Sequence, residues 1–289
     1  TALVKCAQIE PQIAQFINFS PNIKETNESI LTFPLFNPWR TVSSDRIEVN
    51  REANETDAFN KRQQVLTDLQ LNPAKFPSVT KILQSSMSQT SIEALEKWKA
   101  EMIEKLGRDG FAEFQKQTFT RGRLLHQCIA HQLQGEQNIE IDELIKPLWQ
   151  SLTHIFPSIN EVKFIEKTVK HPYLCYKGIV DCVAYYNKEL VVIDWKTSAR
   201  TKPFISNLYD EPLQAVAYLG ALNFDLAFSH IQVDKVAIVI AYTNGTPAQV
   251  HKLSTESCQN YWKHWLSRLK KHWEIVRDKN EQENEGALN

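Results

Sequence analysis

The residues of this chain that are best suited to chemistry are two aspartates and a lysine in the segment 176–198. Asp181 lies in the first of two apolar runs, and Asp194 and Lys196 lie in the second. The runs flank Asn187-Lys188. If these two residues form the turn of a hairpin, Asp181 faces Asp194, with Cβ atoms about 5 Å apart. Side chains alternate along a strand, so Lys196 emerges on the same face as Asp194.

Two facing carboxylates in an apolar hairpin need a cation, because like charges directly opposite each other destabilise a sheet. Lys196 can neutralise one of them, whereas a divalent ion would neutralise both. Hard oxygen ligands favour Mg²⁺ or Mn²⁺ over Zn²⁺. Such an ion would hold a phosphate and lower the pKa of a bound water. Lys196 would orient or deprotonate that water, or support the phosphate charge. The alternative is an ordinary ion pair at a strand edge.

Two helical patterns carry further polar side chains. His126 shares one helical stripe with Gly122 and Ile129, and a histidine in that position is also common in hydrophobic cores. Gln214 and Tyr218 are four residues apart and therefore share a helix face. Their alternative is an amphipathic helix whose tyrosine reaches solvent. Each pattern alone is compatible with a purely structural role.

The spacing of apolar residues predicts an α+β or α/β domain over 61–280. An extended arm over 1–60 is expected before it, and an acidic, disordered tail over 281–289 after it. Asn244-Gly245 predicts a hairpin connection. The expected helices lie near 58–71, 91–106, 111–117, 121–133, 141–155, 212–222 and 255–278, and the expected strands over 162–169, 173–186, 190–195, 236–242 and 249–253.

Composition excludes several classes of protein. The net charge of −1 argues against a strongly basic protein that coats duplex DNA, so any nucleic-acid contact is expected in a local groove. The five cysteines include no close-spaced pair, which excludes a disulfide framework and a zinc knuckle. The chain has no apolar run of about 18 residues, so no membrane span is expected. We expect a monomer.

Taken in order, these motifs resemble the RecB-type branch of the PD-(D/E)xK nucleases. The set is Gly122-x-x-x-His126, Val180-Asp181, Asp194-Trp195-Lys196 and Gln214-x-x-x-Tyr218, and it spans residues 122–218. Phe76-Pro-Ser-Val-Thr80 is similar to the opening of many such domains. Val180 replaces the proline of the family name, a change that this branch tolerates. The resemblance implies a restriction-endonuclease-like core over about 122–253, a mixed sheet flanked by helices. A helical arch over about 91–125 would thread single strands.

The resemblance also implies a role for each position. His126, Asp181, Asp194 and the main-chain carbonyl of Trp195 would bind Mg²⁺ or Mn²⁺. Lys196 would be the catalytic lysine, positioned together with the substrate by Gln214 and Tyr218. Phosphate pairing and base stacking would suit Arg121, Arg123, Phe111, Phe114 and Phe119, although a solvated helical surface would present the same residues. Glu166 is either an outer-shell carboxylate or solvent-facing. No iron–sulfur cluster is expected, because only Cys258 follows the motif region.

The resemblance is strongest to mitochondrial exonucleases of this branch. It implies a metal-dependent exonuclease that acts on single-stranded DNA or DNA flaps in mitochondrial DNA replication and repair. The mitochondrial location rests on the resemblance alone, since no targeting segment is expected within this chain. One alternative is a duplex endonuclease of the same superfamily, and another is a catalytically silent scaffold that binds nucleic acid. The presence of His126, both aspartates and Lys196 favours catalysis over the silent scaffold.

Overall fold

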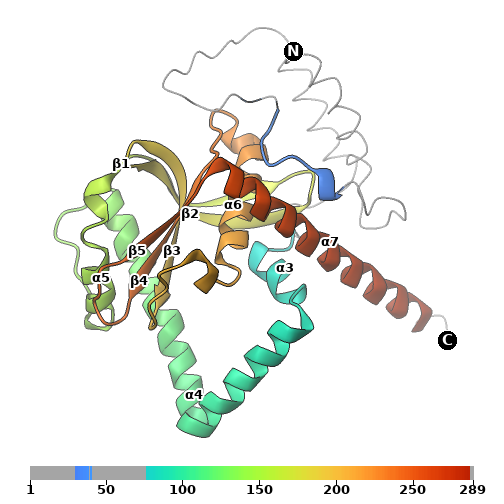
Figure 1. Ribbon diagram of the computed structural model, residues 1–289, viewed down its shortest axis with the longest axis horizontal. Coiled ribbons are helices and arrows are strands. Elements are labelled where there is room, and N and C mark those ends of the chain that lie inside the picture. The colour runs from blue at the N-terminus through green and yellow to red at the C-terminus, as the bar shows by residue number, and fades with distance from the viewer. Residues whose placement is uncertain (1–29, 39, 41–75, 287–289) are drawn as a thin grey trace.

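The structure is a computed structural model that describes residues 30–38, 40 and 76–286, with backbone alone for 279–286. Its centre is a mixed sheet with the strand order β1-β2-β3-β4-β5 (Figure 1). The strands are β1 (Ile159–His171), β2 (Tyr176–Tyr186), β3 (Glu189–Ser198), β4 (Val236–Tyr242) and β5 (Gln249–Leu253). Neighbouring strands are antiparallel except β3 and β4, which are parallel. The predicted α+β class, a mixed sheet flanked by helices, is confirmed.

The central hairpin has the predicted turn and register. Cys182 pairs with Ile193, and Tyr186 pairs with Glu189. The two turn residues both adopt positive φ, 49° at Asn187 and 68° at Lys188, as a type I′ turn requires. The paired ladder ends at Cys182 and Ile193, one residue before Asp181 and Asp194. The two aspartates therefore lie where β2 and β3 stop sharing backbone hydrogen bonds.

Both faces of the sheet are covered. One face packs Val183 and Val192 against α6 (Glu211–Phe224) and α7 (Thr255–Gly286). The opposite face packs Cys182 and Ile193 against α4 (Gln89–Leu133) and α5 (Lys146–Leu152). Burial on both sides explains why the central strands read as almost continuous apolar runs.

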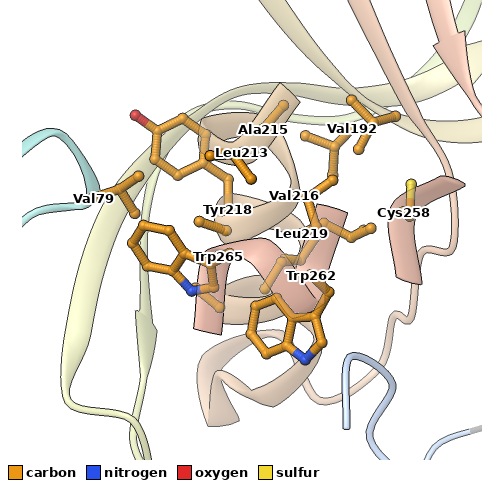
Figure 2. Close-up of a cluster of buried hydrophobic side chains, with 14 of the residues drawn as sticks. Val79, Val192, Leu213, Ala215, Val216, Tyr218, Leu219, Cys258, Trp262 and Trp265 are labelled. Atoms are coloured by element: carbon orange, nitrogen blue, oxygen red, sulfur yellow. The ribbon is translucent and has the colours of Figure 1, made fainter. Parts of the chain in front are cut away.

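Helix α6 connects the parallel strands β3 and β4, which cannot be joined by a tight turn. It is buried along nearly its whole length, between the sheet and α7. Figure 2 shows this core, with Trp262 and Trp265 of α7 packed against α6. Helix α3 (Val79–Ser85) packs beside it, capped by the Ser78 side chain, which accepts a hydrogen bond from Lys81 N.

Helix α4 corresponds to three predicted helices. It is one long element that bends at Gly107, whose φ of 72° is unfavourable for other residues. Trp98 and Phe111 pack edge to face near the bend, with ring centroids 5.9 Å apart. The two arms form the V visible in Figure 1. The predicted break between residues 117 and 121 was wrong, because the second arm is continuous to Leu133.

Three other elements differ from the predictions. The helix expected over 141–155 is shorter, with a 3₁₀ turn (Glu143–Ile145) followed by α5. Strands β4 and β5 are joined by a loop over 243–248 that contains Gly245 in a positive-φ conformation, so the connection is longer than a two-residue hairpin. The backbone of α7 is helical to Gly286, beyond the predicted start of the disordered tail.

Part of the predicted N-terminal arm belongs to the core. Phe33 is buried against α6 and α7, and its carbonyl accepts a hydrogen bond of 2.7 Å from Trp262 Nε1. The Arg40 guanidinium donates to four carbonyls at and just beyond the end of α6, those of Leu222, Asp225, Phe228 and Ile231. The arginine thereby satisfies backbone groups that a helix end leaves without intrahelical partners. The helix predicted over 58–71 lies outside the described residues.

Candidate metal centre

Three side chains from three different elements converge beside the open end of the β2–β3 hairpin. They are His126 from α4, Glu166 from β1 and Asp181 from β2, and one ligand atom of each lies within 4.8 Å of the others. The His126 Nδ1 atom lies 3.2 Å from Glu166 Oε1 and 3.7 Å from Asp181 Oδ1. Its Nε2 atom lies 3.3 Å from the Trp195 carbonyl oxygen. The structure therefore brings together three of the predicted ligands and adds Glu166.

Asp181 is held by the backbone of the neighbouring strand. Its Oδ2 atom accepts a hydrogen bond of 2.8 Å from Trp195 N, in the region where the ladder has ended. The carboxylate thus supplies the acceptor that a strand partner would have provided. Burial, together with the charge of Asp194, raises the pKa of Asp181 to about 7. Without a cation, holding this carboxylate ionised is costly.

Asp194 and Lys196 form a buried ion pair. Asp194 is 1% exposed, and its Oδ2 atom lies 2.5 Å from Lys196 Nζ. Its Oδ1 atom has no hydrogen-bond partner in the part of the chain that the structure describes. Burial alone would lower the pKa of Lys196, but the charges of Asp194 and Asp181 raise it overall. The lysine is therefore a fixed positive charge near neutral pH.

Gln214 and Tyr218 occupy the same face of α6 and touch each other. Gln214 Nε2 donates a hydrogen bond of 2.9 Å to the Tyr218 hydroxyl. Burial and the negative charges of Asp194 and Asp181 raise the pKa of Tyr218, which keeps the phenol neutral. In Figure 2 the tyrosine ring lies beside Val79, and its hydroxyl points away from Trp262 and Trp265. A neutral O–H donor is thus held near the two aspartates.

A glycine that sequence reasoning missed makes room for this tyrosine. A Cβ atom on Gly178 of β2 would lie 2.3 Å from Tyr218 Cε1, well inside van der Waals contact. Gly178 therefore lets the ring pass across the strand. The sequence could not predict this role for Gly178, because the contact joins β2 to α6, which are far apart along the chain.

Glu166 reaches the cluster through an unusual backbone conformation. Its φ is 50°, in a region that non-glycine residues seldom adopt. The pairing of Ile165 with Cys182 and of Lys167 with Val180 places Glu166 opposite Asp181. Strained residues of this kind are concentrated at functional sites. The sequence could indicate neither the φ value nor the register of β1.

The donor set fits a hard divalent cation. It combines a histidine nitrogen with carboxylate oxygens from Glu166 and Asp181 and the main-chain carbonyl of Trp195. The buried Asp194 Oδ1 atom is a further acceptor, because it has no hydrogen-bond partner among the described residues. Asp194 directly precedes Trp195 in β3. Oxygen-rich sets of this composition suit Mg²⁺ or Mn²⁺. Such an ion would also offset the repulsion that raises the pKa of Asp181.

A groove of about 610 Å³ leads along α4 to this cluster. His126 and Glu166 line it together with Phe119 and Arg123, two of the five predicted substrate-contact residues. The other three are placed differently. Arg121 donates to Gln117 Oε1, Phe114 is half-buried, and Phe111 is 8% exposed against Trp98. Phe111 therefore packs on Trp98 within the bent helix and is not among the residues that line the groove.

Comparison with known proteins gives a consistent result. The chain is 39% identical over 256 residues to "Mitochondrial genome maintenance exonuclease 1" of Homo sapiens, covering 88% of this chain and 70% of that protein. It is 40% identical over 244 residues to the Mus musculus protein of the same name, covering 84% of this chain and 68% of that protein. No family model matches. No helix among the described residues is both long and apolar enough to cross a membrane. By its identity to these relatives over most of both lengths, the chain belongs to the mitochondrial genome maintenance exonuclease family.

Proposed function

We propose that this chain is a divalent-metal-dependent exonuclease that hydrolyses phosphodiester bonds of single-stranded DNA or DNA flaps in mitochondria. The observation that carries the proposal is the convergence of His126, Glu166 and Asp181 beside the buried Asp194–Lys196 pair. The names of the relatives support an exonuclease that maintains mitochondrial DNA. Asp181 and Asp-x-Lys on neighbouring strands support a PD-(D/E)xK core of the RecB type.

The proposed ligands are His126, Glu166, Asp181, Asp194 and the carbonyl of Trp195. When bound, Mg²⁺ or Mn²⁺ would polarise the phosphate and lower the pKa of a coordinated water. The contact between His126 Nδ1 and Glu166 fixes the orientation of the imidazole ring. The hydrogen bond from Trp195 N does the same for the Asp181 carboxylate.

Lys196 acts mainly through its charge. Asp194 holds the Lys196 ammonium group in place and raises its pKa. Because the lysine stays protonated, it stabilises the negative charge that develops on the phosphate and does not accept a proton. The neutral Tyr218 hydroxyl, held by Gln214, donates toward the same charge or orients the attacking water. Both groups are fixed before substrate arrives, which avoids reorganisation during the reaction.

The function is tested with linear and circular single-stranded DNA, labelled at either end, in Mg²⁺, Mn²⁺ or EDTA. We expect digestion of the linear strands with metal, no digestion in EDTA, and intact circles. Cleavage of the circle would instead favour the endonuclease alternative. A protein that binds the strands but digests none of them with either metal would be the silent scaffold. The labels also report the polarity of digestion.

Glu166→Gln is expected to weaken Mn²⁺ binding by about tenfold to a hundredfold, because one anionic donor beside His126 is lost. Isothermal titration calorimetry without DNA measures this directly. The matched control is Glu161→Gln. Glu161 is not a proposed ligand, although it lies on the same strand and has a similar positive φ of 43°. Its carboxylate accepts a hydrogen bond from Lys163. Equal Mn²⁺ affinities in wild type and Glu166→Gln would remove Glu166 from the ligand set.

Gly178→Ala is expected to reduce hydrolysis at least about tenfold, because the added methyl group displaces the Tyr218 ring. The strain should also lower stability by about 1–3 kcal/mol. Gly220→Ala is the control for strain, since its Cβ would lie 2.3 Å from Trp262 Cζ3 instead. Rates and thermal melting are measured for both variants. If both lose the same activity for the same loss of stability, Gly178 has no specific role in the site.

A further inference from the structure

The loop over 199–210, between β3 and α6, presents aromatic rings to solvent. Tyr209 is 86% exposed and Phe204 is 67% exposed. Together with Phe119 of α4, at 77%, they are the most exposed large hydrophobic side chains among the described residues. In Figure 1 the loop, drawn in brown, projects from the sheet on the side toward which the arms of α4 extend. Single exposed aromatic residues are common on protein surfaces, so a role for these rings depends on what supports and surrounds them.

The loop is firmly attached to the sheet. Lys202 N donates to the Tyr242 hydroxyl, and the Lys202 carbonyl lies 2.9 Å from His251 Nε2. Gln249 Nε2 donates to the carbonyl of Pro203, the residue before Phe204. Tyr209 N donates to Glu211 Oε2 at 2.6 Å. The backbone that carries both rings is thus fixed by several hydrogen bonds, and the rings are presented to solvent from a rigid support.

Charged side chains link the loop electrostatically with the candidate metal centre. The Lys202 ammonium lies 5.3 Å from the centroid of the Tyr209 ring and 2.9 Å from Glu211 Oε1. Glu211 is close enough to Lys196 for its charge to raise the pKa of that lysine. The loop also follows Lys196 directly along the chain and precedes Gln214. The loop that carries the two rings therefore begins and ends beside residues of the candidate site, Lys196 before it and Gln214 after it.

The charges of the loop suit a polyanion. Its two acidic neighbours are already compensated, Asp210 by Arg268 and Glu211 by Lys202. Arg200 is exposed and forms no ion pair with a described residue. The loop therefore carries one positive charge that no described carboxylate neutralises. Aromatic side chains next to a cationic groove are the usual combination in proteins that bind single strands without sequence preference.

We propose that Tyr209 and Phe204 form a stacking platform for unpaired bases of the substrate strand. The proposal rests on the proposed function and names the feature that selects single strands. Bases in a duplex are already stacked and paired, so their faces are not free to lie on the rings, whereas every unpaired base offers a π face. Phe119, at the groove on α4, would provide a second stacking position toward the other end of the bound segment.

The test uses the full chain in EDTA, so that binding is measured without cleavage, with oligonucleotides that carry 2-aminopurine at successive positions. Stacking on a ring changes the fluorescence of this base. Tyr209→Ser and Phe204→Ser are each expected to weaken single-strand binding by about tenfold and to restore fluorescence at one position. Tyr209→Phe should retain both signals. Leu31→Ser, a change at a 40%-exposed apolar residue of the 3₁₀ turn Ile30–Thr32, should alter neither.

The possible outcomes separate this inference from the proposed function. If the wild type digests single strands and the serine variants match it in affinity and fluorescence, the platform is wrong and the proposed function stands. Equal weakening for a blunt duplex of the same sequence would likewise overturn the platform, because stacking requires unpaired bases. If the wild type neither binds nor digests single strands, both proposals fail. Thermal melting of each variant verifies that the fold is unchanged.

Discussion

Replacing Lys196 with alanine is expected to lower the hydrolysis of a labelled single strand by about 10³-fold at saturating metal. The ammonium group lies 2.5 Å from Asp194 Oδ2 and supplies a fixed positive charge beside the proposed ligand Asp194. Its removal also leaves Asp194 buried without its counter-charge, so the metal-free protein should lose about 3 kcal/mol of stability. Single-turnover rates and chemical denaturation in EDTA measure the two effects separately.

The two effects can be uncoupled by a second substitution. Lys196→Ala combined with Asp194→Asn should regain most of the lost stability, because no uncompensated charge remains, but it should regain no activity. Lys167→Ala is the matched control, since this lysine lies on β1 and its side chain is exposed. Hydrolysis at the wild-type rate by the Lys196→Ala variant would refute the assignment of the catalytic lysine.

Asp181→Asn is expected to make the metal-free protein more stable at pH 8 and nearly unchanged at pH 4. Burial and Asp194 raise the pKa of this carboxyl in the folded state from 3.8 to about 7. The folded protein therefore holds the proton more tightly than the unfolded chain. The free energy of unfolding must then fall as pH rises from about 4 to 7, by up to roughly 4 kcal/mol. The asparagine oxygen can still accept the hydrogen bond from Trp195 N.

Denaturation in EDTA across this pH range tests the prediction. Glu189→Gln is the control of opposite sign, because hydrogen bonds from Lys235 and Lys252 lower the pKa of Glu189 to about 2. The ionised form of Glu189 contributes stability above the unfolded pKa, and that contribution is lost as pH falls toward 2. Because the two ion pairs are partly exposed, the contribution is about 1 kcal/mol or less. If the difference in the free energy of unfolding between wild type and Asp181→Asn did not change with pH, the pKa of Asp181 would not be raised in the folded protein. Mn²⁺ should stabilise the wild type more than the variant.

Local patterns predicted the central hairpin well. Its turn residues and the alternation of apolar side chains are properties of neighbouring residues, so the register that brings Asp181 toward Asp194 could be read directly. The position of Glu166 could not, because it depends on how β1 aligns with β2 and on one residue with positive φ. The contact of Gly178 with Tyr218 is non-local in the same way.

Errors in the helical regions have a common physical cause. Apolar periodicity marks a helix only where the helix packs against something. The part of α4 near 112–120 is mostly exposed, so its periodicity fades although the helix continues. The backbone of α7 likewise runs on through a charged segment of good helix formers. The burial of Phe111 on Trp98 depends on the bend at Gly107, which apolar periodicity does not indicate.

The docking of residues 30–38 and of Arg40 limits how far this protein can be shortened. A fragment that began at residue 61, where the sequence places the start of the domain, would lack Phe33 and leave a void against α6 and α7. It would also lack Arg40, leaving four carbonyls near the end of α6 without their shared donor. That helix carries Gln214 in its first turn and Tyr218 one turn later. A minimal fragment intended for crystallography or kinetics should therefore begin before Ile30.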